Sequence, residues 1–354
     1  MRFSAAHKVL ARALAECAFP AAVVEVGGST RPLWTAAFGR LTFDATAPPT
    51  AGDTIFDLAS LTKVLSTTPL VMRQVERGTL SLDDRVADHL PSWRGADREQ
   101  VTIRDLLAHC SGLPAHRHLY RDHHGRTEFE RAIAQMPLAY PPRTRSIYSD
   151  LGFMLLGFIL EERATLTSQF DALRHQMGGA EDIQFHPPMT WRSRTAPTQN
   201  KPERGGIVIG EVDDDNAWAL GGAAAHAGLF GTAAAVGGCA RHLLQVLQGR
   251  TGAFHRDTVE TFIARQTGVT GSSRALGWDT MLPTSSCGSR MSPEAFGHTG
   301  FTGTSLWIDP ARGVYVVLLT NRVYPDASND AIQEVRRALH DAVMEGISTG
   351  GVGP

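Results

Sequence analysis

The chain has 354 residues, 42% hydrophobic and 20% charged, a composition typical of a globular protein with a sizeable core. The net charge of -2 gives no electrostatic basis for nucleic-acid or anionic-membrane binding, and no apolar run reaches the ~18 residues of a membrane span. The four cysteines match no zinc spacing, so we expect free buried thiols and neither a metal nor a cofactor.

The amino-terminal residues contain no uninterrupted apolar stretch, because Arg12 interrupts residues 9–14. No signal peptide is therefore predicted, and a cytoplasmic location is expected unless an upstream start site supplies an export signal. The oligomeric state is not indicated.

Hydrophobic periodicity predicts the following elements in chain order: a helix at 4–17, strands at 23–26 and 33–38, helices at 61–75, 103–108, 151–162 and 233–247, strands at 306–308 and 314–319, and a helix at 331–343.

Both ends of the chain supply strands, so we expect them to join in one sheet with the middle inserted as a second lobe. This predicts an α/β sheet lobe from residues 1–58 and 275–347, a mostly helical lobe from 59–274, and a disordered tail at 348–354. Residues 187–222 are rich in proline, glycine and aspartate, and are expected to form a long loop that covers a site. A site between the lobes is expected.

Ser60-Leu61-Thr62-Lys63 is the only Ser-x-x-Lys in the chain, and it starts a predicted helix. Residues three apart share one helix face, so the lysine can reach the serine hydroxyl. A desolvated lysine can lose its proton and act as a base, which an arginine cannot do. The alternative is that Ser60 only caps the helix and Lys63 is solvated.

Two further motifs follow at compatible places. Tyr148-Ser149-Asp150 precedes a predicted helix, and His298-Thr299-Gly300 precedes Phe301 and a predicted strand. With Ser60-x-x-Lys63, in this order, they resemble the signature of the penicillin-recognising serine hydrolases.

The resemblance runs from about residue 54 to residue 322 and is nearest to the class C β-lactamase-like branch. Phrases that carry it include Phe56-Asp57-Leu58-Ala59-Ser60 and Ser111-Gly112-Leu113-Pro114. Residues 215–222 and 226–233 are similar to a subgroup that contains exo-acting N-acetylmuramoyl-L-alanine amidases.

This resemblance implies a β-lactamase/transpeptidase-like fold of class α/β + α, in which an antiparallel sheet is flanked by terminal helices and carries a mostly helical inserted lobe. It also implies a serine hydrolase in which Ser60 forms an acyl-enzyme, with Lys63 or Tyr148 as the general base. The backbone N–H groups of Ser60 and Phe301 would form the oxyanion hole. The implied substrate-binding residues are Asp150, His298, Thr299, Gly300, Asn216 and His226.

Two residues depart from the commoner family pattern. His298 replaces a lysine, so a permanent cation that would bind a substrate carboxylate is missing. Asp150 replaces an asparagine, so an amide donor becomes a carboxylate that either holds Lys63 or accepts from a substrate N–H. Both changes favour an amidase, peptidase or esterase over an efficient β-lactamase.

The expected substrate is a small molecule or peptide, with a cell-wall-derived, muropeptide-type amide as the first choice. The alternatives are a carboxylesterase, a weak β-lactamase or D-alanyl-D-alanine carboxypeptidase, and a non-catalytic peptide-sensing binder.

The remaining histidines are harder to assign. Five of them match no zinc motif and are expected on a loop surface: His109, His116, His118, His123 and His124. For His226 there are two alternatives: a histidine that faces the cleft, and a loop histidine that only forms hydrogen bonds within the protein.

Overall fold

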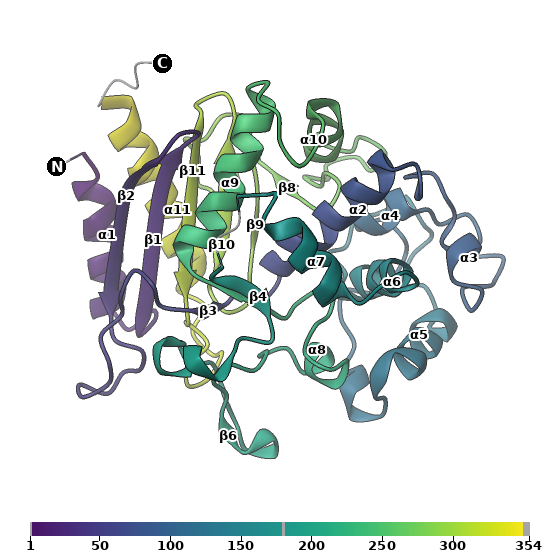
Figure 1. Cartoon of the computed structure of the whole chain (residues 1–354), viewed down its shortest axis with the longest axis horizontal. Helices are drawn as coiled ribbons and strands as arrows, with labels where there is room; N and C mark the ends of the chain where they lie inside the picture. The colour runs from purple at the N-terminus through teal and green to yellow at the C-terminus, as the bar shows by residue number, and fades with distance from the viewer. Residues whose placement is uncertain (1, 179–180, 350–354) are drawn as a thin grey trace.

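A six-stranded antiparallel sheet forms one side of the molecule in the computed structural model, which describes residues 2–178 and 181–349 (Figure 1). The strand order is β2-β1-β11-β10-β9-β8. The strands are β1 (Ala21–Gly28), β2 (Pro32–Gly39), β8 (Asp279–Thr280), β9 (Phe296–Thr299), β10 (Ser305–Asp309) and β11 (Val314–Thr320). Because β1 pairs with β11, the two ends of the chain close one sheet, as the strand pattern predicts.

Helices cover both faces of this sheet. Helices α1 (Ser4–Ala15) and α11 (Ile332–Thr349) lie side by side on one face, and α9 (Ala233–Leu247) lies on the other (Figure 1). Successive strand residues point to opposite faces, so Val24 packs in the core with α1 and α11, whereas Val23 packs in the core with α9. The predicted β-lactamase/transpeptidase-like architecture, a sheet with flanking terminal helices, is confirmed.

The rest of the chain is mostly helical. Its α-helices are α2 (Thr68–Glu76), α3 (Val86–His89), α4 (Ile103–Leu107), α5 (Gly125–Gln135), α6 (Asp150–Glu161), α7 (Leu166–Arg174), α8 (Asp215–Ala219) and α10 (Arg256–Ile263). Its short helical turns are the π-helical η1 (Lys63–Thr67) and the 3₁₀ turns η2 (Leu119–Arg121), η3 (Met189–Arg194) and η4 (Pro202–Arg204). One small sheet contains, in strand order, β3 (Phe56–Asp57), β7 (Leu229–Gly231) and β4 (Ile183–Phe185). Another contains β5 (Asn200–Lys201) and β6 (Gly206–Ile207).

Several expectations need correction. Residues 187–222 contain η3, β5, η4, β6 and α8 instead of one continuous loop, because side-chain caps and ion pairs there stabilise short elements that have no hydrophobic period. Helix α11 includes residues 348–349 of the expected disordered tail, and residues 350–354 lie outside the described part of the chain. Cys17 is exposed, although the other three cysteines are buried and free as expected.

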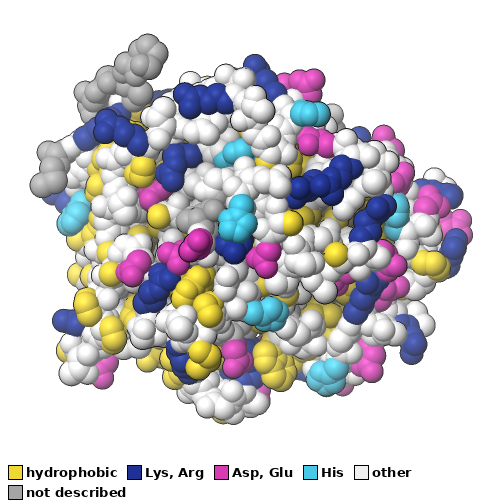
Figure 2. All heavy atoms as spheres, viewed as in Figure 1, with side chains coloured by type: hydrophobic (Ala, Val, Ile, Leu, Met, Phe, Trp, Pro, Cys, Tyr) yellow, Lys and Arg dark blue, Asp and Glu magenta, His cyan; other side chains and the backbone are white. Residues whose placement is uncertain are grey.

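The division into lobes stays a prediction. Helix α9 packs on β1 and β11, although the predicted boundaries assign it to the helical lobe. Among the described residues, no helix has the length and apolar character needed to cross a bilayer. On the face shown in Figure 2, positive and negative side chains are interspersed.

The contact between α9 and β1 leaves no room for a methyl group at Gly237. A Cβ there would overlap the Glu25 carboxylate, which Tyr315 holds through a hydrogen bond of 2.7 Å. Gly237→Ala should therefore lower the free energy of unfolding by roughly 1–3 kcal/mol, although alanine is the better helix former. Urea unfolding measures this, with Gly268→Ala, where the added carbon meets open space, as the control. Equal stability of the two variants would contradict the packing argument.

Candidate active site

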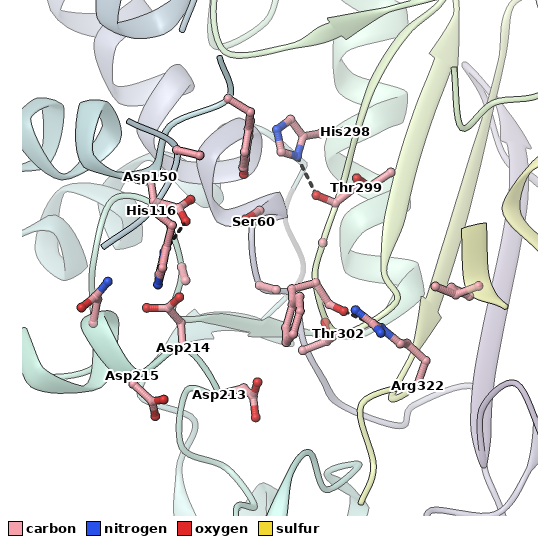
Figure 3. Close-up of a pocket in the computed structure, with 18 of the residues that line it drawn as sticks. Ser60, His116, Asp150, Asp213, Asp214, Asp215, His298, Thr299, Thr302 and Arg322 are labelled. Carbon is pink, nitrogen blue, oxygen red and sulfur yellow. Dashed lines mark hydrogen bonds and ion pairs between the residues drawn. The ribbon is translucent and has the colours of Figure 1, made fainter. Parts of the chain in front are cut away.

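A cavity of about 720 Å³ opens where the turn before η1, the start of α6, the loop before α8 and the end of β9 meet. Ser60 lies between the Asp150–His116 pair on one side and His298 and Thr299 on the other (Figure 3). The three motifs, more than 80 residues apart in sequence, thus line one cavity.

Lys63 is completely buried and donates to three oxygens. Its Nζ lies 2.9 Å from Ser60 Oγ, 2.7 Å from Asp150 Oδ1 and 3.1 Å from the His226 carbonyl. Burial alone would lower the pKa of Lys63, but the Asp150 carboxylate and Tyr148 outweigh it and raise the pKa above its ordinary value. Lys63 is therefore an ammonium with all three donors used, and the solvated alternative is wrong.

The turn that presents Ser60 is held by a buried carboxylate. Ala59 has a φ of 47°, a left-handed conformation that is rare for a residue with a side chain. Asp57 accepts from the Ala59 N–H at 2.8 Å and from the Asp213 N–H at 2.7 Å. Burial, with Asp213 nearby, raises the pKa of Asp57 to about 7. This one side chain therefore fixes both the turn before Ser60 and the loop across the cavity.

Tyr148 is packed beneath Lys63 and beside two histidines. The Lys63 Nζ lies 4.8 Å from the centre of the Tyr148 ring, and the rings of His109 and His298 lie 4.7 and 5.6 Å from it. Burial raises the pKa of Tyr148, although the Lys63 charge acts in the opposite direction. Its buried hydroxyl has no hydrogen-bond partner among the described residues.

His298 is buried and uncharged. Its Nδ1 lies 2.8 Å from the Thr299 carbonyl, to which it donates, and its buried Nε2 has no partner among the described residues. Burial and the nearby charges of Lys63 and Arg274 lower the pKa of His298 well below its ordinary value. His298 thus supplies no cation at neutral pH.

Asp150, the first residue of α6, connects Lys63 to a histidine that faces the cavity. Its second carboxylate oxygen lies 3.2 Å from His116 Nδ1. Burial alone would raise the pKa of Asp150, but Lys63 and His116 outweigh it and hold the pKa well below its usual range. The hydrogen bond that His116 donates to Asp150 raises the pKa of His116. The expectation that Asp150 holds Lys63 agrees with this geometry.

Ser60 and Phe301, whose backbone N–H groups are the predicted oxyanion donors, both line the cavity. Phe301 lies in the turn between β9 and β10, and among the described residues no hydrogen bond uses the backbone N–H of Ser60 or of Phe301. Gly300 packs so closely on the turn before Ser60 that a Cβ at Gly300 would lie 2.8 Å from the Leu58 carbonyl oxygen.

Two of the predicted binding residues have most of their polar groups engaged by the protein itself. The Asn216 amide accepts from the Tyr120 N–H at 3.0 Å and donates to the Arg117 carbonyl at 2.7 Å, so it holds the loop before η2. His226 Nε2 lies 2.9 Å from Asp214 Oδ1, and its carbonyl accepts from Lys63. Asn216 lines the cavity, whereas His226 is buried and is not one of the residues that line it.

The loop-surface expectation is wrong for His109, which is only 1% exposed and accepts from the Ser149 N–H at 3.0 Å, so that it fixes the Tyr148 motif. His116 lies in a loop and is partly exposed as expected, but it also lines the cavity. Arg274 was also missed, and its guanidinium carbon lies 5.1 Å from the centre of the Tyr148 ring. No sequence signal separates it from the other arginines. Across residues 2–178 and 181–349, no three His, Cys, Asp or Glu side chains are grouped as a metal site.

A family model for beta-lactamase matches residues 6–340. The chain belongs to the beta-lactamase family. It is 30% identical over 336 residues to an Escherichia coli protein provisionally named D-alanyl-D-alanine carboxypeptidase, covering 82% of this chain and 75% of that protein. A Salmonella gallinarum protein given the same name is 29% identical over 321 residues, covering 79% and 72%. The expected family resemblance is confirmed, and the protein is a serine hydrolase of this family.

Solved structures agree on the fold. EstCE1, a hydrolase with promiscuous acyltransferase activity, has a TM-score of 0.75 at 22% identity, covering 96% of this chain and 97% of EstCE1. A mutant of simvastatin synthase from Aspergillus terreus also has a TM-score of 0.75, at 20% identity and with coverage of 98% and 97%. A penicillin-binding protein homologue from Caulobacter crescentus has a TM-score of 0.72 at 20% identity, with coverage of 96% and 97%.

The raised pKa of Asp57 predicts a pH-dependent stability that Asp57→Asn removes. Between the ordinary value of 3.8 and about 7, the folded protein holds a proton on Asp57 that the unfolded chain has lost. The stability that the Asp57 proton contributes is present in full below this window and is lost as pH rises through it. Relative to Asp57→Asn, the free energy of unfolding of the wild type should therefore fall by roughly 2–4 kcal/mol across the window. Urea unfolding of both proteins from pH 4 to pH 8 measures the difference, and a constant difference would contradict the assignment.

Proposed function

We propose that the protein forms an acyl-enzyme on Ser60 and hydrolyses a cell-wall-derived, muropeptide-type peptide amide whose leaving group carries a carboxylate. The observation that carries this proposal is the Ser60–Lys63–Asp150 chain of hydrogen bonds at the floor of the cavity. Burying an ammonium costs free energy that well-placed partners must offset. That one of these partners is a serine hydroxyl at the cavity indicates a role of the Lys63 charge in the reaction of Ser60.

In the proposed acylation step, Ser60 Oγ bonds to the carbonyl carbon of the substrate and loses its proton. Lys63 has no free lone pair in this arrangement, so we assign the proton to the Tyr148 oxygen in its ionised form. Burial raises the pKa of Tyr148, so this form is the minor one at neutral pH, and the Lys63 charge offsets part of its cost. Tyr148 then protonates the leaving amine as the bond from carbon to nitrogen breaks. Water attacks the acyl-enzyme by the same route and releases the acid.

The negative oxygen of the tetrahedral intermediate would accept from the N–H groups of Ser60 and Phe301. Removing one such donor costs about 2.7–4 kcal/mol of transition-state stabilisation in other hydrolases. The left-handed turn at Ala59 and the close packing of Gly300 on Leu58 support this use, since they hold both donors at one side of the cavity.

The leaving-group carboxylate is assigned to Arg274. His298 is neutral, whereas the guanidinium of Arg274 lines the cavity near Tyr148 and forms no ion pair with any described residue. A guanidinium binds a carboxylate through two parallel hydrogen bonds. The relatives named D-alanyl-D-alanine carboxypeptidase also support a substrate with a terminal carboxylate.

An ester-cleaving enzyme is the second candidate. The neutral His298 favours it, because an ester without a carboxylate needs no cation beside Thr299. The family match supports an enzyme over the non-catalytic peptide sensor. The cytoplasmic location and the likeness to the amidase subgroup stay predictions.

Ser60→Ala should abolish covalent labelling by a fluorescent penicillin or a fluorophosphonate and reduce turnover of every substrate in a panel of muropeptides, D-alanyl-D-alanine peptides and p-nitrophenyl esters by at least about 10³-fold. The fold should persist, because one oxygen is removed at a cavity wall. Gel fluorescence, turnover and thermal melting check this, with Ser168→Ala, at an exposed position of α7, as the control. Labelling of Ser60→Ala at the wild-type rate would exclude Ser60 as the nucleophile.

Arg274→Gln should lower kcat/KM for a D-alanyl-D-alanine peptide by roughly 10- to 100-fold, the value of hydrogen bonds to a charged group, and leave the corresponding C-terminal amide unaffected. Arg274→Lys should keep part of the preference, and Arg250→Gln, on an exposed loop, serves as the control. Parallel losses for the acid and the amide would show that Arg274 does not bind a carboxylate.

A further inference from the structure

Arg336 brings an unpaired buried charge to the turn that carries Phe301. It lies in α11, is only 7% exposed, and donates from one guanidinium nitrogen to the carbonyls of Gly300 and Thr304, both at 2.8 Å. It pairs with no carboxylate among the described residues, and its Nε has no partner there. Burial lowers the pKa of Arg336 to about 9, so the group remains charged at neutral pH.

A buried cation without a carboxylate is costly, and a structural bond to two carbonyls does not require a charge. The Gly300 carbonyl already accepts from the Gly303 N–H at 3.1 Å, and the Thr304 carbonyl from the Gly300 N–H at 2.7 Å. The turn is therefore closed by its own backbone, and the guanidinium adds positive charge to a loop that is already formed.

The Gly300 carbonyl and the Phe301 N–H belong to one peptide unit. A cation on the oxygen of a peptide draws electron density from its nitrogen, so the N–H becomes a stronger donor. We propose that Arg336 is a positioning residue that strengthens the oxyanion hole by polarising the Gly300–Phe301 peptide. The effect grows as negative charge develops on the substrate oxygen, so it stabilises the transition state more than the bound substrate.

Arg322 provides an internal comparison. It donates to the Phe301 carbonyl at 2.9 Å and lies over the Phe301 ring, but that carbonyl shares its peptide with the N–H of Thr302 (Figure 3). Arg322 therefore orients the turn, whereas Arg336 acts on the donating peptide itself. The inference rests on the part of the proposed function that makes Ser60 the nucleophile and Phe301 an oxyanion donor, and not on the peptide substrate.

The test compares Arg336→Gln, which keeps a hydrogen-bond donor without the charge, with Arg336→Lys, which keeps the charge. Arg337→Gln is the matched control, because Arg337 also donates to two backbone carbonyls, those of Ser285 and Pro283, away from the cavity. For turnover of a p-nitrophenyl ester, Arg336→Gln should lower kcat about tenfold with KM nearly unchanged, a smaller loss than the ~10²–10³-fold seen when a donor is removed. Arg336→Lys should recover most of kcat.

A second measurement keeps the test independent of stability. Phenylboronic acid forms an anionic adduct with a nucleophilic serine. Its inhibition constant should therefore rise for Arg336→Gln by a factor close to the loss in kcat. The melting temperature of Arg336→Gln, measured alongside, should equal that of the wild type. If Arg336→Gln does not fold, Arg336→Met replaces it as the variant without the charge, and Arg336→Lys is still expected to keep most of kcat and of the inhibition by phenylboronic acid.

The outcomes separate the two proposals. Wild-type kcat in folded Arg336→Gln, or an equal loss in Arg336→Lys and Arg336→Gln, would overturn the role of the charge while leaving Ser60 as the nucleophile. Failure of the wild type to be labelled at Ser60 would overturn both.

Discussion

The buried ammonium of Lys63 is the constraint on which the site depends. A lysine completely removed from water requires an oxygen for each of its three donors, and these oxygens come from three separate parts of the chain: the turn at Ser60, the start of α6 at Asp150 and the His226 carbonyl. The cavity exists because these segments must meet around one charge. The π-helical turn η1, which begins at Lys63, is where the chain adapts its helix to this demand.

The two departures from the common family pattern change where the charges lie. The Asp150 carboxylate sits against Lys63 and neutralises it locally, so the pair contributes little net field to the cavity. His298 is held neutral by burial, and the remaining cation beside Tyr148 is Arg274, which comes from the segment before β8. In the proposed function, the charge that the family pattern places on the third motif comes instead from Arg274, in a different element.

The sequence predicted what local pattern and short motifs encode. Helices α1, α6, α9 and α11 and strands β1, β2, β10 and β11 follow from hydrophobic period, and the meeting of Ser60, Lys63, Tyr148 and His298 follows from three motifs in a fixed order. The segment from 187 to 222 did not follow, because its short elements depend on ion pairs such as Lys201–Asp215 that have no period. His109, His116, Arg274 and Arg336 were missed for a related reason. Each is one of many histidines or arginines, and only tertiary packing distinguishes it.

The position of Arg336 gives the sheet topology a chemical consequence. The Phe301 turn connects β9 to β10, and the helix that follows β11 returns across the sheet so that its arginine reaches the Gly300 carbonyl. The same helix packs on α1, which leads into β1, the strand that pairs with β11. Packing of the two terminal helices therefore fixes where the guanidinium sits relative to the turn. The strength of a charge-assisted hydrogen bond falls steeply with distance and angle. A shift of α11 relative to α1 that does not unfold the protein would therefore weaken the bond from Arg336 to the Gly300 carbonyl and, with it, the donor strength of the Phe301 N–H.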